Sequence, residues 1–206
     1  MGLVNHAYEY EDGVDNTKEF KAHYHTHVYH EGIAKKVSNN VVSLIMKTLK
    51  ASGILRDGDP GGELVIVFNN CSGQNKNNTV LKMVTFLCEI LYFKKVQFLF
   101  LVVGHTKNAA DRLFNMLKRF YRLENLFTMA QLFRALAASD SITIHPSTAE
   151  DFFDYDAFLS LFYSDLKGKI KQNHIFRCNI ERNRVGNQIQ IELREINLSQ
   201  HENCPS

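Results

Sequence analysis

The sequence is short of proline, cysteine and long apolar runs, and each shortage excludes a class of protein. Three prolines and 11 glycines in 206 residues exclude collagen-like and proline-rich disordered chains. The longest apolar run, residues 96–103 with Gln97 inside it, is far shorter than the roughly 20 residues that a membrane-spanning helix needs. We therefore expect a folded chain without a membrane-spanning helix.

Two further absences bear on where the protein works. The first six residues have neither the basic start nor the apolar stretch of a secretion signal. The four cysteines are scattered without Cys-x-x-Cys spacing, which is typical of reduced thiols rather than of a disulfide framework. Both features predict a protein of the nucleus or cytoplasm that is not secreted.

The chain also lacks a large excess of charge of either sign. Its 24 Lys and Arg residues against 22 Asp and Glu residues leave a net charge of +2. This balance by itself demands neither a polyanionic nor a membrane partner. Any contact with nucleic acid has to come from a local basic patch.

The middle of the chain predicts a parallel strand pair. The apolar runs at residues 64–68 and 96–103 are typical of strands buried on both faces. Between them, Val80, Val84 and Leu87 recur at the spacing of an amphipathic helix. A strand, a helix and a strand of these lengths form a right-handed crossover, so we expect parallel strands and an α/β fold.

Periodicity predicts the other elements, and the absence of repeats favours one domain over residues 1–206. Further helices are expected over residues 38–50, 110–123, 129–138 and 154–163. Further strands are expected over residues 7–10 paired with 22–30, 142–145, and 174–180 paired with 188–193 around Asn187. Residues 170–206 then form a terminal hairpin and tail.

Two polar loops follow the two predicted parallel strands. Residues 69–78 are rich in amides, and residues 104–111 contain His105 and Lys107. Because parallel strands end at one edge of a sheet, we expect these loops to meet there and to bind an anion through backbone N–H groups. The alternative is that the Asn and Ser residues only form turns and helix caps.

The first loop carries a motif that resembles a known family. Residues 69–77 read NNCSGQNKN, similar to the DNCxGQNKN motif of eukaryotic transposon-derived domains known from oomycetes and arthropods. Gly104, His105, Thr106 and Asp111 match its downstream segment, and the likeness covers about residues 22–180. The resemblance implies an RNase H-like, integrase-type fold, with a mixed sheet and a parallel βαβ core flanked by helices.

In such nucleases an acidic triad holds two divalent metal ions, so the resemblance implies Mg²⁺ or Mn²⁺ if the chain is active and no cofactor otherwise. Asn69 stands where the family has its motif Asp, and a neutral amide removes an anionic metal ligand. Asp111 is the matched acidic candidate for catalysis and metal binding, and His105 could position a phosphate or water, or cap a helix. The family's earlier acidic residue has no counterpart in residues 1–10, so the N-terminal strand is expected to be missing. The resemblance thus implies a degenerate DDE-type nuclease or transposase, a pseudoenzyme.

Basic and amide side chains near these loops are the candidate nucleic-acid contacts. They are Gln74, Lys76, Lys107, Arg112, Lys118, Arg119 and Arg122. The last four lie at spacings that could form a stripe along one helix and contact phosphates, most simply those of DNA. The alternative is a solvated helix face.

Three alternating histidines form a separate group. His23, His25 and His27 project from one face of the predicted strand, a spacing that can supply metal ligands. No acid or cysteine is placed nearby in the sequence to complete a set, so we interpret them as part of a core or surface strand.

Three functional hypotheses follow. The first is a catalytically impaired, transposon-derived RNase H-like domain that binds nucleic acid. The second is an active metal-dependent nuclease or transposase in which the Asn69 carbonyl coordinates metal and another acid, such as Glu31 or Glu63, completes the site. The third is a protein-interaction domain.

Overall fold

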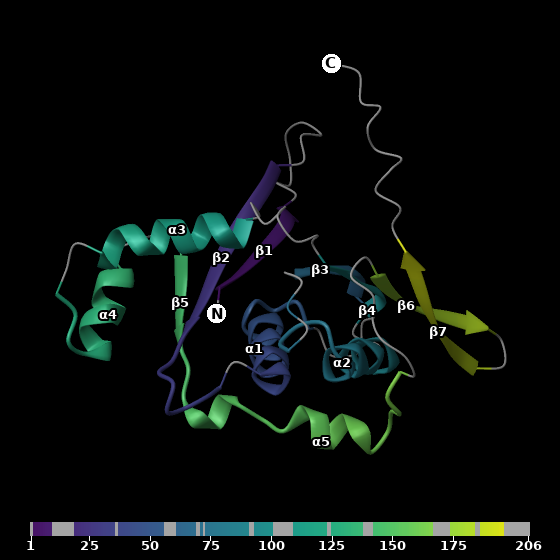
Figure 1. Ribbon diagram of the computed structural model, residues 1–206. Helices are drawn as coiled ribbons and strands as arrows, with labels where there is room; N and C mark the ends of the chain where they lie inside the picture. The colour runs from purple at the N-terminus through teal and green to yellow at the C-terminus, as the bar shows by residue number, and fades with distance from the viewer. Residues whose placement is uncertain are drawn as a thin grey trace. The chain divides into compact units, whose positions relative to one another are not determined.

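The computed structural model describes most of the chain (Figure 1). The described residues are 2–9, 19–35, 37–55, 61–68, 71, 73–90, 93–100, 109–122, 125–137, 142–166, 174–183 and 186–195. They belong to two compact units. The first unit comprises Met1–Ala34 and Lys107–Asp151, and the second comprises Lys35–Thr106 and Phe152–Ser206.

The second unit is built on the predicted parallel crossover. Strand β3 (Gly61–Phe68) pairs in parallel with β4 (Phe93–Phe100), with Ile66 opposite Phe98, and helix α2 (Asn78–Glu89) connects them. The terminal hairpin, β6 (His174–Asn183) and β7 (Gly186–Glu195), adds antiparallel strands in the order β3-β4-β6-β7. The hairpin is confirmed, but its strands close at Asn183 and Gly186 rather than around Asn187.

The predicted burial of β3 on both faces is wrong. Phe68 is buried, but Val65 and Val67 are each 49% exposed, and β3 lies at the edge of its sheet. On β4, Val96 and Phe98 are fully buried and Gln97 and Leu99 only partly. The apolar runs of β3 and β4 are thus strands that bury one face in the core and leave the other face partly exposed.

Helix α2 supplies that core face. Val80, Met83, Val84 and Leu87 are buried, and the helix packs against β4, β6 and β7. Helix α1 (Ser38–Ala51) packs against α2 with Val42, Leu44 and Ile45 buried, close to its predicted bounds. It ends at Ala51, and Gly53 follows the C-cap Ser52 with a φ of +66°, a conformation that glycine adopts without strain.

The first unit has its own sheet and its own core. Strand β1 (Gly2–Glu9) pairs antiparallel with β2 (Glu19–Val28), and β5 (Ile142–Pro146) pairs in parallel with the other side of β2. Helices α3 (Ala109–Tyr121) and α4 (Met129–Leu136) lie close to their predicted bounds, and a 3-10 turn, η1, covers Ala149–Asp151. The buried core of this unit consists of Leu113, Leu117, Leu136 and Ile142.

The protein is thus a mixed α/β protein, as predicted, with one parallel strand pair in each unit. Its described strands form two sheets, whereas the expected RNase H-like core has a single mixed sheet. Strand 142–145 is confirmed as β5, but it pairs with β2 and not with the strands of the crossover. Among the described residues, no helix combines the length and apolar character needed to cross a membrane.

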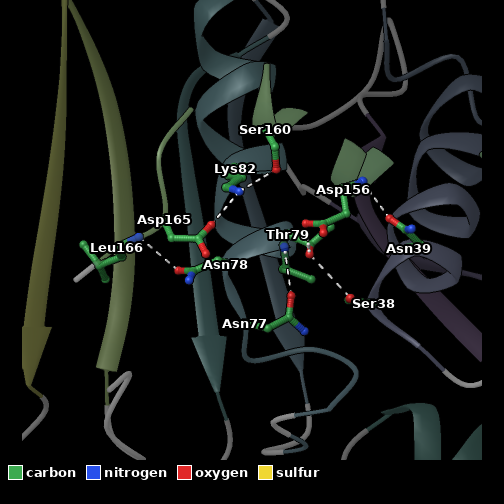
Figure 2. Close-up of polar contacts among 11 residues, drawn as sticks. Ser38, Asn39, Asn77, Asn78, Thr79, Lys82, Asp156, Ser160, Asp165 and Leu166 are labelled. Carbon is green, nitrogen blue, oxygen red and sulfur yellow. Dashed lines mark hydrogen bonds and ion pairs between the residues drawn. The ribbon is translucent and has the colours of Figure 1, made fainter. Parts of the chain in front are cut away.

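Residues 152–166, which we call the strap, lie along α2 in the second unit (Figure 2). The strap contains helix α5 (Tyr155–Ser160), which begins where Asp154 caps the backbone N–H of Ala157 at 3.1 Å. The fully buried Leu159 anchors its inner side. Figure 1 shows the strap running beneath α1 and α2.

Polar pairs tie the strap to α2 along its length (Figure 2). The Thr79 hydroxyl donates to Asp156 at 2.7 Å, and the Lys82 ammonium donates to Ser160 at 2.9 Å. Near the other end of α2, the Tyr163 hydroxyl donates to the Glu89 carboxylate. Because the partners advance together in sequence, α5 runs parallel to α2.

The contacts between the strap and α2 include an ion pair with a buried lysine. Lys82, 6% exposed, lies 2.6 Å from the exposed carboxylate of Asp165. This hydrogen bond and charge hold the pKa of Asp165 below its usual range. A lysine that would be costly to bury alone is therefore neutralised by the strap.

We predict that Thr79→Val lowers the free energy of unfolding by about 1–2 kcal/mol, because an isosteric change removes a hydrogen bond to a carboxylate. Thr85→Val on the same helix is the control, since its hydroxyl bonds only to the Leu81 carbonyl of its own helix. We expect the control to change stability by less than about 0.5 kcal/mol in urea unfolding. Equal effects of the two changes would contradict the structural role of the Thr79–Asp156 contact.

Candidate functional site

The two parallel strands of the second unit end side by side. Phe68 closes β3 and Phe100 closes β4; the two are register partners, and their rings stack 5.8 Å apart. We call this end of the strand pair the carboxyl edge. Of the predicted site residues that follow these strands, Asn69, His105 and Lys107 lie outside the described residues.

The amide-rich loop after β3 winds around one carbonyl. The Cys71 oxygen accepts the backbone N–H groups of Gln74, Asn75 and Lys76 at 3.3, 2.8 and 3.1 Å. The Asn77 side chain caps α2 by accepting the Val80 N–H at 3.1 Å. The backbone donors of residues 74–76 are thus used within the loop, and the expected backbone cradle for an anion cannot include them.

Lys76 is the unusual residue of this loop. Its side chain is buried at 6% exposure, and its ammonium has no hydrogen-bond partner among the described residues. The ammonium lies 5.3 Å from the centre of the Phe100 ring, at the carboxyl edge. Burial lowers the pKa of Lys76, because removal from water disfavours the charged form.

The sequence around this edge contains almost no acid to balance that charge. Between residues 69 and 110 the only carboxylate is Glu89. Glu89 ends α2, about 16 Å along the helix from its first residue, and accepts the Tyr163 hydroxyl. The neighbours of Lys76 in the chain therefore supply amides, a thiol and hydroxyls, but no counter-ion.

The remaining predicted contacts divide between the two units. Gln74 is half-buried in the loop of the second unit. On α3 of the first unit and directly after its end, the exposed basic residues are Arg112, Lys118 and Arg119, and then Arg122. They lie on the side of the helix opposite the buried Leu113 and Leu117, so four cations face solvent.

The predicted meeting of Asn69 with Asp111 stays a prediction. Asp111 lies on α3 of the first unit, and Asn69 belongs to the second unit and lies outside the described residues. Among the described part of the chain, no three His, Cys, Asp or Glu side chains are grouped to hold a metal ion.

Of the two acids suggested to replace the missing carboxylate, Glu63 lies away from the carboxyl edge. Glu63 lies at the opposite end of β3, about 16 Å from Phe68 at the rise of a strand, and pairs with Lys95 at 2.5 Å. Glu31 lies in a turn of the first unit. The described residues of the loop after β3, 71 and 73–78, include no carboxylate, whereas a two-metal centre requires several.

Two of the three alternating histidines belong to a cluster whose third member, His145, the sequence did not predict. His25 and His27 on β2 share a sheet face with His145 on β5, which lies in register with His27. Nδ1 of His25 lies 2.9 Å from Nε2 of His145, and the His27 and His145 rings stack 4.9 Å apart. Only the pairing of β2 with β5 reveals it, since 118 residues separate His27 from His145 in the sequence.

A family model described as a domain of unknown function (DUF7869) matches residues 13–195. The chain belongs to this family. The DUF7869 match spans both units and includes the carboxyl edge and α3. No protein of curated function and no solved structure matches the chain. Membership in DUF7869 therefore assigns no activity.

We predict that Lys76→Met raises the free energy of unfolding by about 1 kcal/mol, because it removes a desolvated charge that no described group balances. In thermal melts, inorganic phosphate should stabilise the unmodified protein more than this variant. Lys50→Met, at an exposed position on α1, should leave both quantities unchanged. A Lys76→Met protein that is clearly less stable would contradict an unbalanced ammonium.

Proposed function

We propose that this protein is a catalytically impaired, transposon-derived RNase H-like domain that binds nucleic acid. The observation that carries the proposal is the buried ammonium of Lys76 at the carboxyl edge. This is the position at which open α/β sheets bind their ligands. A buried cation that no described residue balances favours an anionic ligand, and a phosphodiester supplies such a group.

The helix that follows the loop adds to this preference. α2 begins two residues after Lys76, and the amino end of a helix carries a partial positive charge. The ammonium and the helix dipole both favour a negative group at the carboxyl edge. Asn75 and Lys76 are buried there, so a phosphate would be held by a preformed loop.

The same residues argue against strand cleavage. Metal-dependent phosphoryl transfer uses carboxylates to hold cations that neutralise the reacting phosphate. The motif acid is replaced by Asn69, and Asp111 is the first carboxylate after Glu89. A single matched acid supports binding without efficient catalysis, and neither Mg²⁺ nor Mn²⁺ is needed for that binding.

The exposed face of α3 supports a second contact with the backbone of DNA. Lys118 and Arg122 lie one turn apart, and Arg112 and Arg119 lie seven residues apart on the same side. Four solvent-facing cations on one helix side suit sequence-independent contacts with phosphates. The two surfaces belong to different units and contribute to binding separately.

We predict that duplex DNA binds with an affinity that falls steeply with salt. Replacing Lys118, Arg119 and Arg122 together by alanine should reduce the slope of log affinity against log salt by about 3, since each neutralised phosphate contributes roughly 0.9. Lys50→Ala should leave the slope unchanged. Fluorescence anisotropy between 50 and 300 mM salt measures both, and salt-independent or absent binding would favour a protein-interaction domain.

We also predict no robust cleavage of DNA strands by the unmodified protein in Mg²⁺ or Mn²⁺. Asn69→Asp restores one anionic ligand and is the variant in which activity should first appear. Strong cleavage by the unmodified chain that Asp111→Ala abolishes would instead support an active nuclease. Asp111→Ala should change the affinity for DNA by less than about twofold relative to the unmodified protein. A loss of cleavage in this variant can then be told apart from a loss of DNA binding.

A further inference from the structure

The strap presents an apolar outer surface to solvent. Phe158, Leu161 and Phe162 are 43%, 78% and 66% exposed. Phe158 lies on α5, and Leu161 and Phe162 lie three and four residues later in the turn that follows the helix; the rings of Phe158 and Phe162 are 5.4 Å apart. We call these three residues the strap patch.

The segment that carries the strap patch is packed against α2 on its other side. Leu159 between its members is fully buried, and the rings of Phe158 and Phe86 of α2 meet edge to face at 5.8 Å. The hydrogen bonds of Asp156 and Ser160 to α2 lie on the inner side (Figure 2). The strap patch is thus the exposed side of a segment, α5 and the turn after it, whose other side is packed against α2.

The size of the strap patch indicates the kind of partner. Taking side-chain areas of roughly 150–250 Å², the three residues expose about 350 Å² of apolar surface. Patches of this size on a soluble protein are often binding sites. A stable interface between two globular proteins needs about 800 Å² on each side, so the strap patch suits a single helix or a narrow groove.

The charge of the strap indicates the chemistry of that partner. Residues 152–166 contain three aspartates, at positions 154, 156 and 165, and no Lys or Arg. Lys82 neutralises only Asp165, whereas Asp154 and Asp156 remain exposed and bond to the uncharged Asn39 and Thr79. A second copy of the strap would place carboxylates against carboxylates, which disfavours self-association through this surface.

We propose that the strap patch binds an amphipathic helix of another protein whose apolar face is edged by Lys and Arg. The patch receives the apolar face, and the exposed carboxylates of the strap attract the basic edge. This inference does not depend on nucleic-acid binding, because it rests on the exposed residues of the strap and uses neither Lys76 nor the basic residues of α3. DNA binding and strap binding can each fail alone.

The test uses three synthetic 15-residue peptides with fluorescent labels and the full chain. The first places leucines on one helical face and lysines along its edges, the second replaces the lysines by glutamates, and the third has the composition of the first in an order without a single apolar face. We expect the first peptide to bind at least tenfold more tightly than either of the others. Higher salt should weaken it, as expected for paired charges.

Leu161→Ser and Phe162→Ser should each weaken binding of the first peptide at least tenfold. Phe127→Ser is the matched control, because Phe127 is 83% exposed and lies in the first unit. The control should bind as the unmodified protein does. Thermal melts of all three variants show whether they are folded, and Leu161 and Phe162 are chosen because they are more exposed than Phe158.

Several results would overturn the proposal. They are equal binding of the lysine and glutamate peptides, unchanged binding by both serine variants, or equal loss in Phe127→Ser. Concentration-dependent self-association that Leu161→Ser abolishes would identify a second copy as the occupant. Binding to phosphatidylcholine vesicles that Phe162→Ser abolishes would identify a lipid surface instead.

Discussion

The second unit depends on the burial of α2. This helix packs against three strands, α1 and α5, so even its polar side chains, Thr79 and Lys82, are enclosed. Enclosed polar groups have to be partnered, and the strap supplies the partners: Asp156 for the hydroxyl, and Ser160 with Asp165 for the ammonium. The strap is therefore required by the charge of α2 as much as by its apolar contacts.

Two buried lysines of this unit differ in whether they have a partner. Lys76 and Lys82 are equally buried, yet only Lys82 has a carboxylate and a hydroxyl within hydrogen-bond distance. Lys76 lies against an aromatic ring, which attracts a cation but balances it far less than a carboxylate does. Among the described residues, the fold thus neutralises one buried lysine and not its neighbour six residues earlier, and the proposed anion site rests on this difference.

Local periodicity predicts the helices and the crossover well, because buried positions on α1, α2 and α3 recur at helical spacing. It could not show that Val65 and Val67 are exposed, because a run of apolar residues is equally compatible with a strand buried on one face and a strand buried on both. It could not place β5 beside β2, because the pairing joins residues far apart in the chain. The meeting of the two polar loops stays a prediction, because residues 104–108 of the second loop lie outside the described residues. Asn suits a cap and a ligand equally well, and only the Asn77–Val80 contact decides for a cap there.

The order of elements along the chain interleaves the two units. Each unit is assembled from two stretches separated by a stretch of the other, and β4 pairs with β6 about 80 residues later, as Lys95 does with Asn179. During synthesis on the ribosome, β3 and β4 are made long before β6 and β7, so their sheet is completed only at the end. Such long-range pairing slows folding. No single cut in the gene yields either unit intact, so separating them for expression calls for a rearranged chain rather than a truncated one.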